Sequence, residues 1–453
     1  MDISRHYLNI GGRTVHYRRC GEGPPLLMIH QSPRSSAEYE ALMRDWGAHF
    51  TCIAPDTPGF GQSDPLPDAD PEIGAFADAV VEFARALGVE QTAAYGFHSG
   101  GIILVTALKR HRELFTGLAI GGYAIWNAEE MAIFGERYLP PFLPSDYGEH
   151  LVWLWNRILE QSWFFPWFDI SNTARLPGAH ADPVRVHAIV MEMLDSRDAY
   201  RLGYGAVLRA PRDIPAADAK TPPVLISAYD GDPLQAHIDR LGAMPEGWRA
   251  EKVASQKAHQ DLSLDFLLAH RGPEMKAFAE DRDRGFLNVS TPEFKGLIHW
   301  RHYRSGTSLI IHAPGRSLEL LPGLAGFAID LPGHGLSAPW PDHPPNDWGA
   351  WQRLIDQCAA NLGATEVHYE SYAAGDPEKL FPDLAPDRFG HYLTKAWSIV
   401  RAGHFFAPWY EAAHDTALSF DPASLDPTLL AIEHRALLRA NAARAYAFAR
   451  KGI

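Results

Sequence analysis

Cysteine is scarce in this chain. Only three cysteines occur in 453 residues, Cys20, Cys52 and Cys358, and none stands in a paired or metal-like spacing. The first residues, MDISRH, contain no apolar core of a secretion signal. We therefore expect the protein to reside in a reducing cytoplasm.

Long apolar runs and an excess of basic residues are lacking as well. No uninterrupted apolar segment approaches the roughly 20 residues that a membrane-spanning helix needs. The 55 acidic residues outnumber the 41 basic ones and give a formal charge of −14. This charge disfavours nucleic acid and anionic membranes as partners, so we expect a small-molecule ligand. A chain of this length suits two domains or one large decorated domain.

The most informative segment is a glycine-framed turn at residues 96–100, Gly-Phe-His-Ser-Gly. This frame is typical of a nucleophile elbow, a strained strand-to-helix turn that exposes its middle side chain above the sheet edge. Residues 91–95 before it are typical of a buried strand, and the apolar residues 101–108 after it of a helix. A hydrolase would place serine at the middle position, but this chain has His98.

The first half of the chain alternates predicted strands with predicted helices. Strand-like segments occupy residues 8–17, 25–29 and 50–54, with glycine turns at 11–12 and 21–23. Amphipathic, helix-like segments occupy residues 37–46 and 73–87. Such alternation predicts an α/β fold with a mostly parallel sheet and helices on both faces.

These motifs together resemble the α/β-hydrolase fold superfamily over about residues 5–275. They are His30-Gln31, the loop DTPGFGQS at 56–63, and the elbow at 96–100. In that family, the strand after an inserted helical cap delivers an acid and a later loop delivers a histidine. The resemblance implies a core over residues 1–280 with its cap at about 123–210. It places the acid at Asp232 and the histidine at His259, in the loop 257–261.

The predicted cap is rich in aromatic residues. Trp126 and Trp163 are the candidates for contact with an apolar substrate. The other interpretation is that these side chains only pack the cap onto the sheet, as aromatic residues at helical spacing usually do.

The second half of the chain repeats the first. Residues 330–337, Asp-Leu-Pro-Gly-His-Gly-Leu-Ser, align without gaps with residues 56–63, and the cap tryptophans Trp155 and Trp167 align with Trp397 and Trp409. The alignment places Ala373 at the middle of the second elbow and leaves no room for the helix and strand that should follow. We therefore expect residues 289–453 to form a truncated, catalytically incomplete repeat after a charged linker at about 277–288. Its preserved task is packing, against the first cap or, in a homo-oligomer, against a second subunit.

The chemistry that we favour is hydrolysis without a cofactor. His98 attacks an ester, a thioester or the acyl carbon of a carbon–carbon bond in a small apolar carbonyl compound, or activates water together with His259. Asp232 and His259 form an acid–base pair that moves the protons. The backbone N–H groups of Ser99 and Gln31 are expected to form the oxyanion hole.

Several alternatives remain open at this point. His98 and His259 could act as acid and base in a lyase, a decarboxylase or a cofactor-free oxygenase. The three predicted residues could instead bind a metal, or the site could belong to a ligand-binding protein without activity. Ser99 could be the nucleophile if the frame shifts by one residue. His30 could support its loop or contact the substrate.

Overall fold

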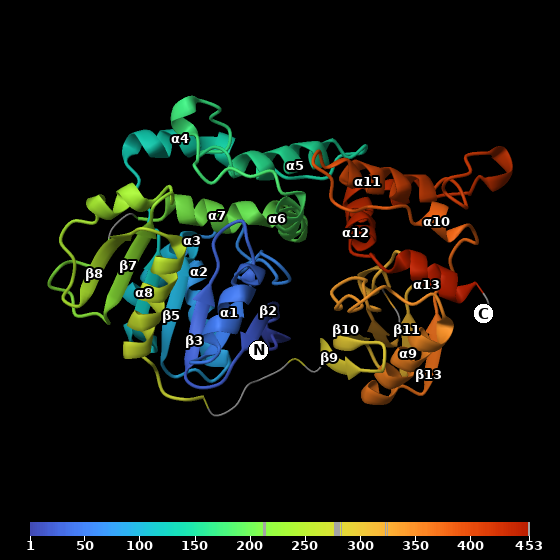
Figure 1. Ribbon diagram of the computed structural model, residues 1–453, viewed down its shortest axis with the longest axis horizontal. Coiled ribbons are helices and arrows are strands. Elements are labelled where there is room, and N and C mark those ends of the chain that lie inside the picture. The colour runs from blue at the N-terminus through green and yellow to red at the C-terminus, as the bar shows by residue number, and fades with distance from the viewer. Residues whose placement is uncertain (212–213, 276–280, 282, 322, 324, 452–453) are drawn as a thin grey trace. The chain divides into compact units, whose positions relative to one another are not determined.

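The computed structural model describes residues 1–211, 214–275, 281, 283–321, 323 and 325–451. They form two compact units (Figure 1). The first unit comprises Met1–Phe142 and Asn156–Asp281, and the second comprises Leu143–Trp155 and Arg282–Ile453.

The first unit contains an eight-stranded sheet in the order β1-β2-β4-β3-β5-β6-β7-β8. β1 and β2 pair antiparallel, as do β2 and β4, and all later neighbours pair parallel. The predicted mostly parallel sheet of the α/β-hydrolase fold is therefore present. The strands are β1 (Ser4–Ile10), β2 (Arg13–Cys20), β3 (Pro25–Ile29), β4 (Thr51–Pro55), β5 (Thr92–Phe97), β6 (Phe115–Gly121), β7 (Val224–Tyr229) and β8 (Trp248–Val253).

Helices cover both faces of this sheet. Successive residues of a strand point to opposite faces, so Leu27 and Ile29 of β3 join one core while Leu26 and Met28 join the other. The first core packs against α2 (Ile73–Ala86) and α3 (Ser99–Arg110), and the second against α1 (Glu40–Trp46) and α8 (Gln256–Ala269). Burial on both faces explains why β3 is continuously apolar.

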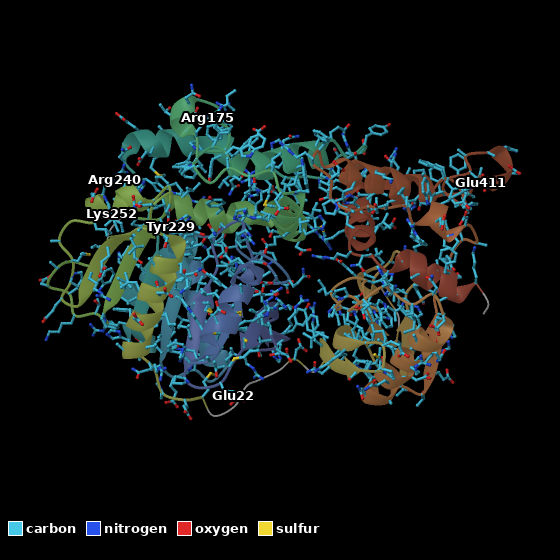
Figure 2. The ribbon with its side chains drawn as sticks, in the orientation of Figure 1. Glu22, Arg175, Tyr229, Arg240, Lys252 and Glu411 are labelled. Carbon is cyan, nitrogen blue, oxygen red and sulfur yellow. The ribbon has the colours of Figure 1, made fainter. Side chains whose placement is uncertain are left out.

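Among the described residues, four α-helices lie between β6 and β7 in the chain, where the cap was predicted. They are α4 (Ala128–Tyr138), α5 (Glu149–Gln161), α6 (Pro183–Ser196) and α7 (Tyr200–Arg209). The strand after these helices, β7, ends at Tyr229, which Figure 2 labels. The first residues of α5, up to Trp155, belong to the second unit.

The second unit repeats the first five strands. Its sheet order β9-β10-β12-β11-β13 matches β1-β2-β4-β3-β5, with the same parallel and antiparallel pairings. Its strands are β9 (Arg284–Ser290), β10 (Lys295–Tyr303), β11 (Ser308–Ile311), β12 (Gly326–Ile329) and β13 (Glu366–Tyr369). Its helices are α9 (Trp348–Leu362), α10 (Pro377–Leu380), α11 (His391–Gly403), α12 (Pro427–Leu438) and α13 (Ala443–Arg450).

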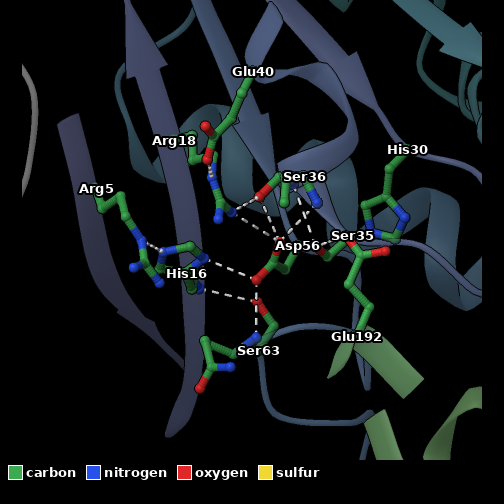
Figure 3. A network of polar contacts seen from close by, with 12 residues as sticks. Arg5, His16, Arg18, His30, Ser35, Ser36, Glu40, Asp56, Ser63 and Glu192 are labelled. Carbon is green, nitrogen blue, oxygen red and sulfur yellow. Dashed lines mark hydrogen bonds and ion pairs between the residues drawn. The ribbon is translucent and has the colours of Figure 1, made fainter. Parts of the chain in front are cut away.

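A buried histidine–aspartate pair recurs in both units. In the first, His16 Nδ1 lies 2.8 Å from Asp56 Oδ2, and Ser36 donates to the other carboxylate oxygen (Figure 3). In the second, His299 Nδ1 lies 2.8 Å from Asp330 Oδ2. Each aspartate begins the duplicated glycine loop and accepts a hydrogen bond from an N–H of that same loop. The repeated network supports the duplication that the aligned loops predicted.

The boundary between the repeats differs from the expected linker. β9 begins at Arg284, so a strand occupies residues 284–288 of the segment predicted as linker. Residues 277–280 and 282 of that segment lie outside the described residues. After β13 the chain forms only the short α10 before α11, where the first unit has α3 and β6.

Candidate active site

His98 occupies the elbow between β5 and α3. Its backbone has φ 48° and ψ −112°, a strained conformation for a residue with a side chain, and its N–H donates to Gly121 O over 2.7 Å. The glycine frame is required by packing. A Cβ on Gly100 would lie 1.9 Å from Ile29 O, in the neighbouring strand.

Asp232 pairs directly with the elbow histidine. His98 Nε2 lies 3.1 Å from Asp232 Oδ1 and 3.2 Å from Oδ2. The two residues follow β5 and β7, whose carboxyl ends share one edge of the parallel sheet. Asp232 is buried, whereas the His98 side chain is 22% exposed. The arrangement is a dyad in which a buried carboxylate orients a partly accessible imidazole.

Gly122, directly after the intervening strand β6, makes this pairing possible. Its φ is 58°, and a Cβ built on it would lie 2.6 Å from His98 Cδ2 and 2.9 Å from Asp232 Oδ2. Sequence reasoning did not single out this glycine. The signal that could have found it is a Gly-Gly pair at the end of the strand that follows the elbow helix.

The carboxylate of the dyad is held ionised. Burial by itself raises the pKa of Asp232, but the adjacent His98 imidazole and the N–H of Leu234, which donates over 2.8 Å, lower that pKa below its usual value overall. An ionised Asp232 accepts the proton carried by His98 Nε2. The other ring nitrogen, Nδ1, then carries the lone pair.

His259 is not where the family pattern predicts it. The predicted loop 257–261 lies within α8, which Ser255 caps by accepting a hydrogen bond from Ala258 N–H. His259 is therefore in the first turn of a helix and only 1% exposed. Its Nε2 lies 2.9 Å from Tyr95 Oη and its Nδ1 2.7 Å from Ser227 Oγ. The expected pairing of Asp232 with His259 is replaced by the pairing of Asp232 with His98.

A cavity of about 150 Å³ opens between the elbow and the cap, entirely within the first unit. This volume is close to that of an engineered protein cavity that holds benzene. None of the described residues that line it carries a formal charge. They are Gln31, Ser32, His98, Ser99, Ile102, Ala124, Trp126, Phe134, Tyr138, Gln161, Phe165, Leu176, Tyr204, Val207, Leu208, Pro233 and Leu234.

The predicted oxyanion hole is partly occupied by the protein itself. Gln31 N–H donates to Glu38 Oε1 over 2.7 Å, so it does not face an incoming oxyanion as expected. Burial raises the pKa of this Glu38 to about 7. Ser32 N–H donates to Ser99 Oγ over 2.6 Å. The Ser99 hydroxyl oxygen therefore accepts a hydrogen bond from Ser32, and its O–H group remains able to donate one.

The remaining predicted contacts divide between the cavity and its supports. Trp126 lines the cavity. Trp163 does not line it; its Nε1–H donates to His180 O over 2.6 Å and fixes the cap loop. His30 is buried and does not line it either. Thr57 N–H donates to His30 Nε2 over 2.9 Å, so His30 supports the loop.

Three polar side chains of the cap line the cavity and were missed by sequence reasoning: Tyr138, Tyr204 and Gln161. The hydroxyl groups of the two tyrosines lie 2.8 Å apart. Burial raises the pKa of both phenols, so both stay protonated. Single polar residues in amphipathic helices give no sequence signal that separates a cavity-facing position from a surface position.

Two further features follow from the described parts of the chain. No group of three or more His, Cys, Asp or Glu side chains there is arranged to hold a metal ion, so His98, Asp232 and His259 do not form the ligand set considered above. Among the described helices, none has the length and hydropathy of a transmembrane span.

Comparison with known proteins adds the following. Residues 24–169 match the family described as alpha/beta hydrolase fold. Haloalkane dehalogenase 2 of Mycobacterium tuberculosis is 26% identical over 228 residues, which cover 49% of this chain and 76% of that protein. The soluble epoxide hydrolase of Corynebacterium sp. is 31% identical over 120 residues, 26% of this chain and 41% of that protein. A solved hydrolase structure from Pseudomonas aeruginosa covers 58% of this chain and 98% of its own, with 18% identity and a TM-score of 0.45.

Proposed function

This chain belongs to the α/β-hydrolase superfamily and is an enzyme of the hydrolase type, and from that premise we propose a hydrolytic reaction without a cofactor. The reaction cleaves an ester, a thioester or a carbon–carbon bond of a small, uncharged carbonyl compound. The observation that carries the proposal is the His98–Asp232 dyad at the elbow. It combines a fixed tautomer with a partly exposed ring at the edge of an uncharged cavity.

In the proposed reaction His98 is the nucleophile. Its Nδ1 lone pair forms a bond to the acyl carbon, and the leaving group departs and takes up a proton from solvent. The acylated imidazole is then positively charged, and the ionised Asp232 beside Nε2 compensates that charge. Water attacks the acyl carbon, the bond to Nδ1 breaks, and the acid product and a proton are released.

The oxyanion of each tetrahedral intermediate needs donors, and Ser99 supplies them in this proposal. Its hydroxyl accepts from Ser32 N–H and can donate its own proton into the cavity. Its backbone N–H lies in the first turn of α3, where the helix dipole favours negative charge. A donor in an oxyanion hole is worth about 3 kcal/mol, or a hundredfold in rate.

The test is an acylation experiment with 4-nitrophenyl acetate. Acid quenching followed by peptide mass spectrometry is expected to find an acetyl group on the His98 peptide, localised to His98 by fragmentation. The Ser99→Ala variant should still form this adduct, but about a hundredfold more slowly. An acetyl adduct on Ser99 in the wild-type protein would contradict the assignment of His98 as the nucleophile. Complete loss of acylation in the Ser99→Ala variant would contradict it as well.

Acid–base chemistry without a covalent intermediate is the second candidate. The observation that favours it is that the backbone N–H groups of Ser32 and Gln31 both donate hydrogen bonds to other residues of the protein. In this alternative His98 alone takes a proton from water or from a carbon next to the carbonyl, because His259 lies outside the cavity lining. Turnover in the absence of any acetyl adduct would favour this mechanism, and binding without turnover would indicate a ligand-binding protein.

A further inference from the structure

Gln161, the last residue of α5, presents a fixed amide to the cavity. Arg157, one helical turn earlier, donates from Nη1 to Gln161 Oε1 over 3.0 Å. A guanidinium only donates hydrogen bonds, so the amide atom that faces Arg157 is the oxygen and the opposite atom is Nε2. The NH2 group is therefore the part of this side chain that is left for a ligand.

Arg157 is itself held firmly inside the cap. It is 1% exposed, and its guanidinium lies 5.5 Å from the centre of the Trp167 ring and 5.9 Å from that of Tyr200. A buried cation that donates to the amide oxygen also polarises the amide and strengthens its N–H groups as donors. Gln161 is thus a positioned donor, whereas a solvent-exposed glutamine would adopt many orientations.

The cavity indicates which group this donor would bind. None of the described lining residues is charged, so a carboxylate inside would lack a facing cation and would pay the cost of desolvation. The volume limits the ligand to a compact molecule. An uncharged oxygen acceptor, such as a carbonyl, ether or hydroxyl oxygen, meets both conditions.

We propose that Gln161 Nε2 binds a second, uncharged oxygen acceptor of the substrate. The substrate class is then a compact carbonyl compound with a further oxygen, of the alkoxycarbonyl or dicarbonyl type. This rests on the proposed function only in placing the reactive carbonyl at His98. Recognition by Gln161 is a binding property and is measured without turnover.

The test compares two ketones of nearly equal shape, methoxyacetone and 2-pentanone, by ligand-observed NMR titration of the full chain. They differ by an ether oxygen in place of a methylene group. Wild-type protein is expected to bind methoxyacetone at least threefold more tightly, in keeping with one net hydrogen bond. Gln161→Leu should abolish or reverse this preference. The surface variant Gln91→Leu should keep it.

Equal affinities in wild-type protein, or an unchanged preference in a folded Gln161→Leu variant, would overturn the proposal. Arg157→Lys retains a donor to the amide oxygen and should keep most of the preference, whereas Arg157→Met should lose it if Arg157 positions the amide. Because the titration measures binding alone, a protein that shows the preference but cleaves no ester, thioester or carbon–carbon bond would refute the proposed function and leave this inference standing.

A second observation concerns the part of α5 up to Trp155 and α11, both in the second unit, which come from equivalent segments of the two repeats. Gly148 corresponds to Gly390, and Trp155 to Trp397. A Cβ on Gly148 would lie 3.0 Å from the Trp397 ring, and one on Gly390 would lie 2.4 Å from the Trp155 ring. Each tryptophan thus packs on the glycine of the other repeat.

The ring contacts are reciprocal as well. His150 lies 5.0 Å from Trp397 with an interplanar angle of 79°. Its equivalent, Tyr392, lies 5.7 Å from Trp155 with an interplanar angle of 86°. Reciprocal contacts in which residue i meets j and the equivalent of j meets the equivalent of i are typical of a two-fold symmetric dimer.

We infer that this contact is a dimer interface contained within one chain, in which the second repeat takes the part of a second subunit. Of the two packing partners that the sequence left open for the repeat, the cap segment of the first repeat is the one seated there. The full chain then exists in solution as a monomer of 50.3 kDa.

Light scattering after size exclusion tests this inference. Wild-type protein should have the mass of one chain at all concentrations. Replacing both Gly390 and Trp397 with arginine removes the internal partner of α5, and two chains should then pair through Gly148 and Trp155. The control Phe389→Arg, at a 69% exposed position beside the contact, should remain a monomer. A wild-type dimer, or a folded double variant that stays monomeric at high concentration, would overturn the inference.

Discussion

Replacing His98 with glutamine is expected to lower kcat/KM for 4-nitrophenyl acetate by at least about a thousandfold, because the variant lacks both the nucleophile and a titratable base. Asp232→Asn should lower it by about a hundredfold to ten-thousandfold. An asparagine at this position can turn its NH2 group toward Nε2. Nε2 would then accept and the proton would move to Nδ1, which leaves the nucleophilic nitrogen without its lone pair.

The double variant separates a functional dyad from two independent contributions. If His98 and Asp232 act as one unit, His98→Gln with Asp232→Asn should be about as slow as His98→Gln alone. The control is His49→Gln, an exposed histidine of the same unit, which should keep wild-type activity. Thermal unfolding of each variant checks that the fold is retained. A folded His98→Gln variant with more than a tenth of wild-type activity would contradict the proposed mechanism.

His98 and Asp232 could each be singled out from the sequence, but their pairing with each other could not. Elbow and acid are both marked by local patterns, a glycine frame and a turn after a buried strand. The position of His259 depends instead on where α8 begins. Because Ser255 caps the helix, His259 falls in its first turn and faces the core hydroxyls of Tyr95 and Ser227. A start a few residues later would have left it in a loop.

The cap shows the same limit. Its presence, position and aromatic content could be predicted from the chain order of the family. Which side chains face the cavity depends on the rotation of each helix and on loop closure, so Trp126 lines the cavity and Trp163 holds a loop. Gln161 could not be singled out, because its role depends on Arg157 one turn away and on the cavity beside it.

The duplication could be detected in the sequence because the glycine loops and the buried histidine–aspartate pairs impose the same steric and hydrogen-bonding needs in both repeats. Asp56 and Asp330 each hold their loop by accepting a hydrogen bond from an N–H group within it. The reciprocal packing of Trp155 and Trp397 could not be detected in this way. Predicting it requires knowing which repeat supplies the packing partner. An alignment shows that two positions are equivalent in the repeats, but not whether their side chains are in contact.

Acid should destabilise the first unit through His259, with a loss of about 2 kcal/mol in unfolding free energy between pH 7 and pH 5 from this residue. Burial lowers its pKa from 6.5 to about 4; the negative charge of Asp232 raises the pKa and His98 lowers it, but burial is the larger effect. The folded protein keeps the ring neutral between these two values while the unfolded chain binds a proton. The stabilisation is therefore complete above pH 6.5 and is lost as pH falls toward 4.

Urea unfolding of wild-type and His259→Gln proteins at pH 7 and pH 5 measures this term. The variant is expected to be less stable at pH 7, because two buried hydrogen bonds change, yet to lose about 2 kcal/mol less than wild type on going to pH 5. The exposed variant His49→Gln should follow the wild-type pH dependence. Parallel losses in wild type and His259→Gln would mean that His259 is already protonated in the folded protein, and would return it to the list of groups able to donate a proton in catalysis.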